Sequence, residues 1–153
     1  MTQSASAAGA TQATARPPRL GGILETSLYV HDLARSRDFY ARIFGFEEFL
    51  DDGRLCVMGV ASGQVLLLFK RGAAAQPAPT PGGVIPPHDG TGHLHLCFAI
   101  PRGELERWGS HLEAQGIAVE SRVSWPGGAV SLYFRDPDGH SLEVATPGLW
   151  PNY

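Results

Sequence analysis

Residues 23–30 (ILETSLYV) alternate between mainly aliphatic even positions and more polar odd positions, which include Glu25 and Tyr29. A period of two is typical of a strand whose two faces have different surroundings. The next residues, LARSRDFYARIF, have apolar side chains at helical spacing and lie between a candidate N-cap, Asp32, and a helix-ending glycine, Gly45. The pattern predicts a strand followed by a helix.

Three short strands are predicted next, and the whole order then recurs in the second half of the chain. The first half has strands at FEEFL, RLCVMGV and QVLLLF. The second half has a strand at HLCFAI, a helix at RGELERWGSHLEAQG and strands at IAVESRV, AVSLYFR and SLEVA. This internal repeat predicts an α+β fold with two βαβββ modules, at about 23–70 and 93–147, that form a curved mixed sheet around a central cavity.

Spacing relates positions in the two halves. From the first strand to the glycine that ends the helix is 20 positions in the first half and 21 in the second, counted from Glu25 and His95. These two residues are therefore predicted to be equivalent, as are Leu67 and Glu143 on the last strands. Each lies on a strand face opposite an apolar face, so all four are expected to point into the cavity.

Three of these four side chains are of types that bind metals. An isolated buried carboxylate costs several kcal/mol, and a divalent cation compensates two of them at once. We therefore predict that Glu25, His95 and Glu143 bind one divalent ion per site, with Mn, Ni, Co, Zn and Fe all left open. Positions on the ion remain free for water or substrate.

Two segments differ from the modules in composition. Residues 72–92 are rich in Pro and Gly, as in a lid or binding loop, and they contain His88. Residues 1–20 are rich in Ala, Ser, Thr and Gln, and we expect a disordered N-terminal tail before a single domain at 21–153.

Composition narrows the function classes. The net charge of −3 gives no basic footprint for nucleic acid or an anionic membrane, and no apolar run is long enough to span a bilayer. The first residues lack the features of a secretory signal. Two cysteines do not make a disulfide framework, so we expect a cytoplasmic protein.

The stretches ETSLYVHDLARSRDFYARIFGF, HLCFAI and YFRDPDGHSLEV occur in order and at family-like spacing. On them the chain resembles the vicinal oxygen chelate superfamily, which includes glyoxalase I, bleomycin- and fosfomycin-resistance proteins and extradiol dioxygenases. The resemblance implies a glyoxalase-like fold and carries the family's metal ligands onto Glu25, His95 and Glu143. Two departures argue against particular activities. Leu67 stands where glyoxalase I has a Glu, and the ligand set lacks the two His of an iron dioxygenase.

The resemblance implies a metal-dependent enzyme that chelates neighbouring oxygens of a small molecule, of lyase, isomerase or dioxygenase type. Candidate catalytic residues are Glu143, Glu25 and Tyr133. The alternative is a metal-free small-molecule-binding or drug-sequestering protein of the bleomycin-resistance type, whose cavity would simply hold its ligand. Nothing in the sequence identifies the substrate.

Further residues are predicted to line the site or to support it. The candidate substrate-binding residues are His93, Arg135, Tyr29, Cys97 and His88. Trp108 is expected in the core, and His140 is expected to be solvated. Small relatives with this layout resemble two-fold dimers, so we expect a homodimer whose sites lie within one chain or are shared between two.

Overall fold

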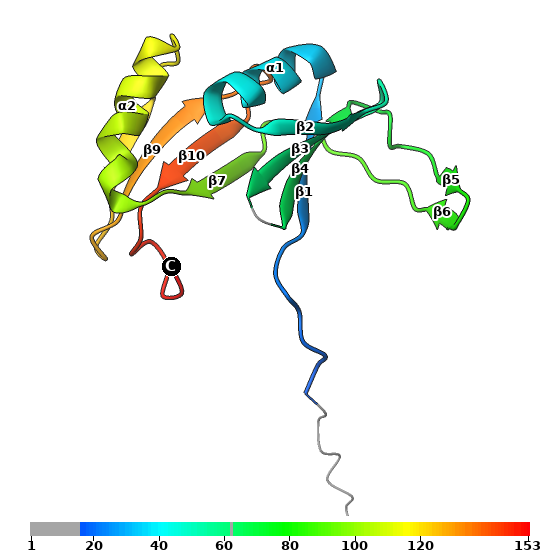
Figure 1. The fold of residues 1–153 in the computed structure, drawn as a ribbon, viewed down its shortest axis with the longest axis horizontal. Helices are drawn as coiled ribbons and strands as arrows, with labels where there is room; N and C mark the ends of the chain where they lie inside the picture. The colour runs from blue at the N-terminus through cyan, green and yellow to red at the C-terminus, as the bar shows by residue number, and fades with distance from the viewer. Residues whose placement is uncertain (1–15, 62) are drawn as a thin grey trace, which may run out of the picture.

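In a computed structural model, which describes residues 16–61 and 63–153, the chain forms two βαβββ modules joined by a hairpin (Figure 1). The first contains β1 (Glu25–Val30), α1 (Leu33–Phe44), β2 (Glu47–Asp51), β3 (Leu55–Ala61) and β4 (Gln64–Lys70). The second contains β7 (His95–Ala99), a 3₁₀ turn η1 (Arg102–Glu104), α2 (Leu105–Ala114), β8 (Ser121–Ser124), β9 (Val130–Arg135) and β10 (Ser141–Ala145). The predicted fold class is confirmed.

The connecting segment, predicted as a lid or binding loop, contains some regular structure. It contains a short antiparallel hairpin, β5 (Ala78–Thr80) and β6 (Gly83–Ile85), which projects from one end of the molecule (Figure 1). Of the predicted N-terminal tail, residues 1–15 lie outside the described residues, and 16–20 are exposed without regular secondary structure. Among the described residues, no helix has the length and apolar character needed to cross a membrane.

Each module has one mixed four-stranded sheet, in the order β1-β4-β3-β2 in the first and β7-β10-β9-β8 in the second. The first and last strands of each module pair in parallel. Glu25 pairs with Val65, two positions before Leu67, and His95 pairs with Ser141, two positions before Glu143. The registers therefore confirm the equivalences predicted from spacing.

The caps of α1 form as the sequence predicts. The Asp32 side chain accepts a hydrogen bond from the Arg35 amide, and Gly45 adopts the left-handed conformation that a side chain would disfavour. In α2, Leu105 and Leu112 are buried. Trp108 is only half-buried, against the core rather than inside it, which corrects the expectation for this residue.

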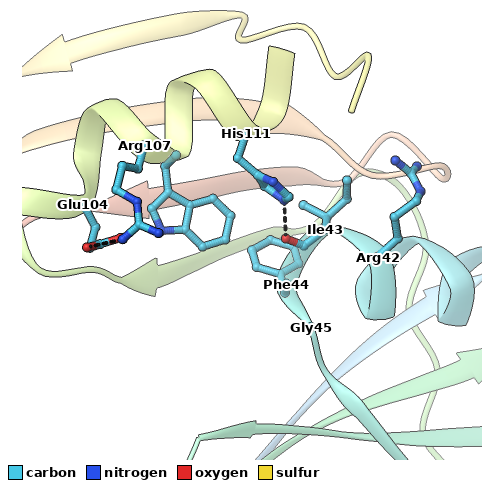
Figure 2. Close-up of a pocket in the computed structure, with 8 residues that line it drawn as sticks. Arg42, Ile43, Phe44, Gly45, Glu104, Arg107 and His111 are labelled. Atoms are coloured by element: carbon cyan, nitrogen blue, oxygen red, sulfur yellow. Dashed lines mark hydrogen bonds and ion pairs between the residues drawn. The ribbon is translucent and has the colours of Figure 1, made fainter. Parts of the chain in front are cut away.

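The two modules share one hydrophobic core. Phe44, at the end of α1, contacts the rings of Phe98, Trp108 and Phe134 from the second module. Figure 2 shows the groove of about 420 Å³ at this junction, where the His111 imidazole hydrogen-bonds the Ile43 carbonyl. The apolar area buried at this junction stabilises one arrangement of the modules within a chain.

Polar groups also join the modules. His140 is 1% exposed, so the expectation that it is solvated was wrong. Its Nδ1 accepts from the Leu94 amide and its Nε2 donates to the Tyr29 carbonyl, which connects the last β-turn to strands of both modules. Asp136 accepts a hydrogen bond from the Tyr40 hydroxyl. Each of these buried groups is therefore satisfied across the junction.

A second junction contact lies nearer the surface. Asp138 accepts hydrogen bonds from the backbone amide and imidazole of His31, at 2.8 and 2.6 Å, and from the Ser36 hydroxyl. Burial acts to raise the pKa of this carboxyl, but the hydrogen bonds from His31 and Ser36 outweigh it, and the pKa is lowered. The ionised form is therefore favoured in the folded protein.

A lowered pKa contributes stability that is present above the unfolded value of about 3.9 and lost as pH falls through the folded value. We predict that Asp138→Asn lowers the free energy of unfolding at pH 7 by about 1–2 kcal/mol. The difference in the free energy of unfolding between Asp138→Asn and wild type should shrink near pH 3, as measured by urea denaturation. The control Asp38→Asn, at an exposed ion pair with Arg37, should cost less than about 0.5 kcal/mol. A pH-independent loss in Asp138→Asn would contradict this account.

Candidate metal and substrate site

Glu143, at the centre of β10, is a buried carboxylate on an otherwise apolar strand. It is 3% exposed, and its Oε1 has no hydrogen-bond partner among the described residues. A buried acceptor without a partner costs free energy, and a charged one costs more. Oε1 therefore lacks, among the described residues, the hydrogen bond or positive charge that would compensate its burial.

His95, on the neighbouring strand β7, faces this carboxylate. Its Nε2 lies 3.3 Å from Glu143 Oε2, and its Nδ1 lies 3.1 Å from the Ser141 carbonyl oxygen. Because a carbonyl only accepts, Nδ1 carries a proton, and when the ring is neutral Nε2 presents a lone pair to the carboxylate. Two acceptors that face each other fit a shared cation, and a backbone carbonyl bonded to the other ring nitrogen is typical of metal-binding histidines. These two residues therefore fit a metal ion.

Cys97 and Tyr133 flank Glu143 on the same sheet face, as its register partners on β7 and β9. The Tyr133 ring stacks on His95 with centroids 6.2 Å apart. Partial removal from water and the Glu143 carboxylate raise the pKa of the Cys97 thiol to about 12, and the same two causes raise the pKa of the Tyr133 phenol. Both side chains are thus protonated donors at neutral pH beside the carboxylate.

The other two candidates in this module lie toward the edge of the face. Arg135 forms an ion pair with Glu120 at 3.0 Å and donates to the Gly139 carbonyl. The His93 imidazole is exposed and lies against the same glycine, close enough that a Cβ there would be 2.9 Å from Nε2. Neither residue contacts the His95–Glu143 pair through a hydrogen bond between described residues.

Glu25 does not join the pair within one chain. It is exposed at the start of β1, and its carboxylate does not lie within 4.8 Å of both His95 Nε2 and Glu143 Oε2 in the described structure. Instead it lines a pocket of about 500 Å³ between the first sheet and the connecting segment. The lining residues of this pocket all come from the first module and the connecting segment.

Tyr29 and His88 form one wall of that pocket. The Tyr29 hydroxyl lies 2.6 Å from His88 Nδ1, and the His88 amide donates to the Ala74 carbonyl. Gly90 passes so close to the Tyr29 ring that a Cβ would be 2.4 Å away. Burial and then the Asp89 carboxylate raise the pKa of Tyr29. The connecting segment is thus packed onto the pocket, as the prediction of a binding loop requires.

The structure also brings together a cluster that sequence reasoning missed. Glu48, Asp51 and Cys56 each place a ligand-type atom within 4.8 Å of the others. Arg37 already lies 3.7 and 3.5 Å from the two carboxylates. Burial raises the pKa of Cys56 to about 11, and its thiol donates to the Met58 sulfur. The cluster is thus explained as an ion-pair network over a buried thiol, and only the pairing of β2 with β3 could have revealed it.

Comparison with known proteins identifies relatives with several activities. The model of the Glyoxalase/Bleomycin resistance protein/Dioxygenase superfamily matches residues 22–144. Metallothiol transferase FosB of Bacillus licheniformis is 34% identical over 59 residues, 38% of either protein. Catechol-2,3-dioxygenase of Bacillus subtilis is 29% identical over 121 residues, which are 76% of this chain and 38% of the dioxygenase. The matched region thus spans well under half the length of these curated relatives.

Solved structures match over nearly their whole length. Lactoylglutathione lyase from Agrobacterium tumefaciens is 36% identical with a TM-score of 0.79, covering 89% of this chain and 99% of that one. An integron cassette protein from the Halifax Harbour sewage outfall is 28% identical with a TM-score of 0.66, and the match covers 83% of this chain and 99% of that protein. The fosfomycin resistance protein FosX from Listeria monocytogenes, at 20% identity and a TM-score of 0.63 over 86% and 97%, shares the fold.

The position of Cys97 beside Glu143 gives a chemical prediction. Because its thiol pKa is about 12, chelator-treated protein should react slowly with iodoacetamide at pH 8, although Cys97 is exposed. Glu143→Gln removes the carboxylate but not the desolvation, so the half-maximal labelling pH should fall partway toward the ordinary value of about 8.5. Mass spectrometry measures the rate, with Cys97→Ser as the control for Cys56. An unchanged or higher labelling pH in Glu143→Gln would contradict the assigned contact.

Proposed function

The chain belongs to the Glyoxalase/Bleomycin resistance protein/Dioxygenase superfamily, and on that basis we propose that it is a metal-dependent enzyme acting on a small molecule with two neighbouring oxygens. The observation that carries the proposal is the buried Glu143 carboxylate, whose Oε1 lacks a described partner and whose Oε2 faces His95 Nε2 at 3.3 Å. The curated relatives cited above carry the names of enzymes, which supports an enzyme here.

In this proposal His95 and Glu143 hold the ion from one sheet, and Glu25 completes the set. The hydrogen bond to the Ser141 carbonyl fixes the orientation and the tautomer of the His95 ring, so that Nε2 already faces the site before an ion binds. Two carboxylates and one imidazole balance the charge of a divalent cation. When bound, the cation supplies Lewis acidity that stabilises negative charge developing on substrate oxygens.

The chain's own groups then position the substrate and move protons. Tyr133 stays protonated at neutral pH and stacks on His95, so its hydroxyl is placed to donate to a substrate oxygen. Glu25 is the exposed carboxylate of the set. When it is not bound to the ion, its carboxylate is the group that accepts a proton from the substrate. Packing of the connecting segment onto the pocket through Tyr29, His88 and Gly90 restricts water.

We further propose that the site is shared between two chains of a homodimer. Within one chain Glu25 lines the 500 Å³ pocket of the first module and a smaller pocket of about 200 Å³ beside Cys97, yet it does not reach the His95–Glu143 pair. The His95 face is open, with 53% of the His95 side chain exposed. The hydrophobic core that the two modules share keeps Glu25 apart from His95 and Glu143 within one chain. A two-fold partner that brings its second module over the first would place the partner subunit's Glu25 opposite His95 and Glu143.

The lyase activity in the name of the Agrobacterium structure is not proposed for this chain. Leu67 occupies the position equivalent to Glu143 and is 9% exposed, so the first module offers an aliphatic group where a carboxylate would be a fourth ligand. That residue argues against lactoylglutathione lyase activity. The reaction type within the superfamily stays at lyase, isomerase or dioxygenase, in a cytoplasmic enzyme. A metal-free binding protein is the competing function.

Metal affinity separates the two functions. Isothermal titration of chelator-treated protein with Mn²⁺ or Zn²⁺ should show one site per chain. Glu143→Gln and His95→Gln should each weaken binding at least about 100-fold, since changes to outer partners alone cost about 10–100-fold. Glu106→Gln, at an exposed ion pair with Arg122, is the matched control and should bind as wild type. Absence of binding in wild type would support the metal-free alternative.

Mixed dimers test whether the site is shared. Glu25→Ala and Glu143→Ala proteins should each fail to bind metal at the wild-type affinity. After subunit exchange, a shared geometry restores one intact site per mixed dimer, because each variant supplies what the other lacks. Sites built within one chain would show no recovery. Light scattering should also report twice the 16.4 kDa monomer mass, and a monomer would contradict the arrangement.

A further inference from the structure

We infer that the first module binds the apolar body of the substrate, while the second module holds its oxygens; the division of roles rests on the proposed function. The observation is a chemical difference between equivalent positions. Ser141 and Glu143 on β10 correspond to Val65 and Leu67 on β4. One fold unit therefore presents a polar face, and its repeat presents an aliphatic one.

The apolar character extends over the floor of the first-module pocket, the part that β3 and β4 form, whereas β1 contributes Glu25, Ser27 and Tyr29. Strands β3 and β4 contribute Leu55, Val57, Val65, Leu67 and Phe69, which belong to a hydrophobic cluster distinct from the shared core. These five side chains offer no hydrogen-bond donor to a polar ligand, and the hydroxyl of Tyr29, in the same cluster, already lies 2.6 Å from His88 Nδ1. The floor thus favours hydrocarbon over hydroxyl or oxyanion groups.

The pocket has the size and closure of a small-molecule site. Its volume is about 500 Å³, compared with roughly 150 Å³ for an apolar cavity that binds one benzene. The connecting segment closes it through Ala74, which is 6% exposed, and through His88, whose ring packs edge-on against Phe69 at 4.7 Å. The occupant is therefore a compact ring or branched hydrocarbon group rather than an extended peptide.

Two charged residues, Arg54 and Glu25, also line the pocket. The Arg54 guanidinium lies 5.8 Å from the centroid of the Phe69 ring, and its Nη2 is 3.8 Å from Asp52. Polar groups thus surround an apolar floor, which fits an amphiphilic substrate whose oxygens lie toward the second module and whose body lies on Leu67.

Two ring-shaped probes of opposite polarity test the inference without metal. Cyclohexanol and myo-inositol share a six-membered ring and differ in hydroxyl content. Titrated into chelator-treated protein with labelled Leu and Val methyl groups, cyclohexanol should shift the NMR signals of Val57, Val65 and Leu67. It should bind at least about tenfold more tightly than myo-inositol, from the apolar area it buries.

A double variant supplies the control on location. Val57→Thr with Val65→Thr keeps the shape of both side chains and adds hydroxyls to the floor, so cyclohexanol affinity should fall at least about fivefold. The control Val119→Thr, at a loop residue that is 38% exposed, should leave the affinity for cyclohexanol unchanged. Equal affinity for the two probes, shifts outside the pocket methyls, or an unaffected double variant would overturn the inference. Because no ion is present, failure of the metal proposal leaves this result intact, and the reverse also holds.

Discussion

The buried carboxylate of Glu143 is the constraint on which the site depends. Strand β10 places one carboxylate at its centre, 3% exposed, with one oxygen lacking any partner among the described residues and the other facing an imidazole nitrogen. Such a group is unfavourable in the isolated chain. A cation that neutralises it would turn this cost into binding free energy, which explains why a module face can retain a charge that folding alone would disfavour.

The repeat explains how one chain makes two different faces. Both modules have the same strand order and the same register, so their inward positions are fixed by geometry. Side chains at those positions are then free to differ, and they give a polar face with His95 and Glu143 and an aliphatic face with Leu67. The buried junction through Phe44 and His140 holds the two faces in one relation within the chain.

Much of the fold was predictable because periodicity, caps and spacing are local. The Asp32 and Gly45 caps and the equivalence of Glu25 with His95 follow directly from the sequence. The buried state of His140 did not, because its partners, the Leu94 amide and the Tyr29 carbonyl, come from distant backbone. The position of Glu25 relative to His95 and Glu143 was also beyond the sequence, since it depends on how the modules pack rather than on any strand pattern.

Crystals of the protein grown with Mn²⁺ would test the central claim most directly through an anomalous difference map. The account predicts one peak per chain, with His95 Nε2, a carboxylate oxygen of Glu143 and a carboxylate oxygen of the partner subunit's Glu25 at about 2.0–2.2 Å. A peak bound by Glu25 of the same chain would contradict the shared site. No peak beside His95 and Glu143, or one at Glu48 and Asp51 instead, would contradict the metal centre itself.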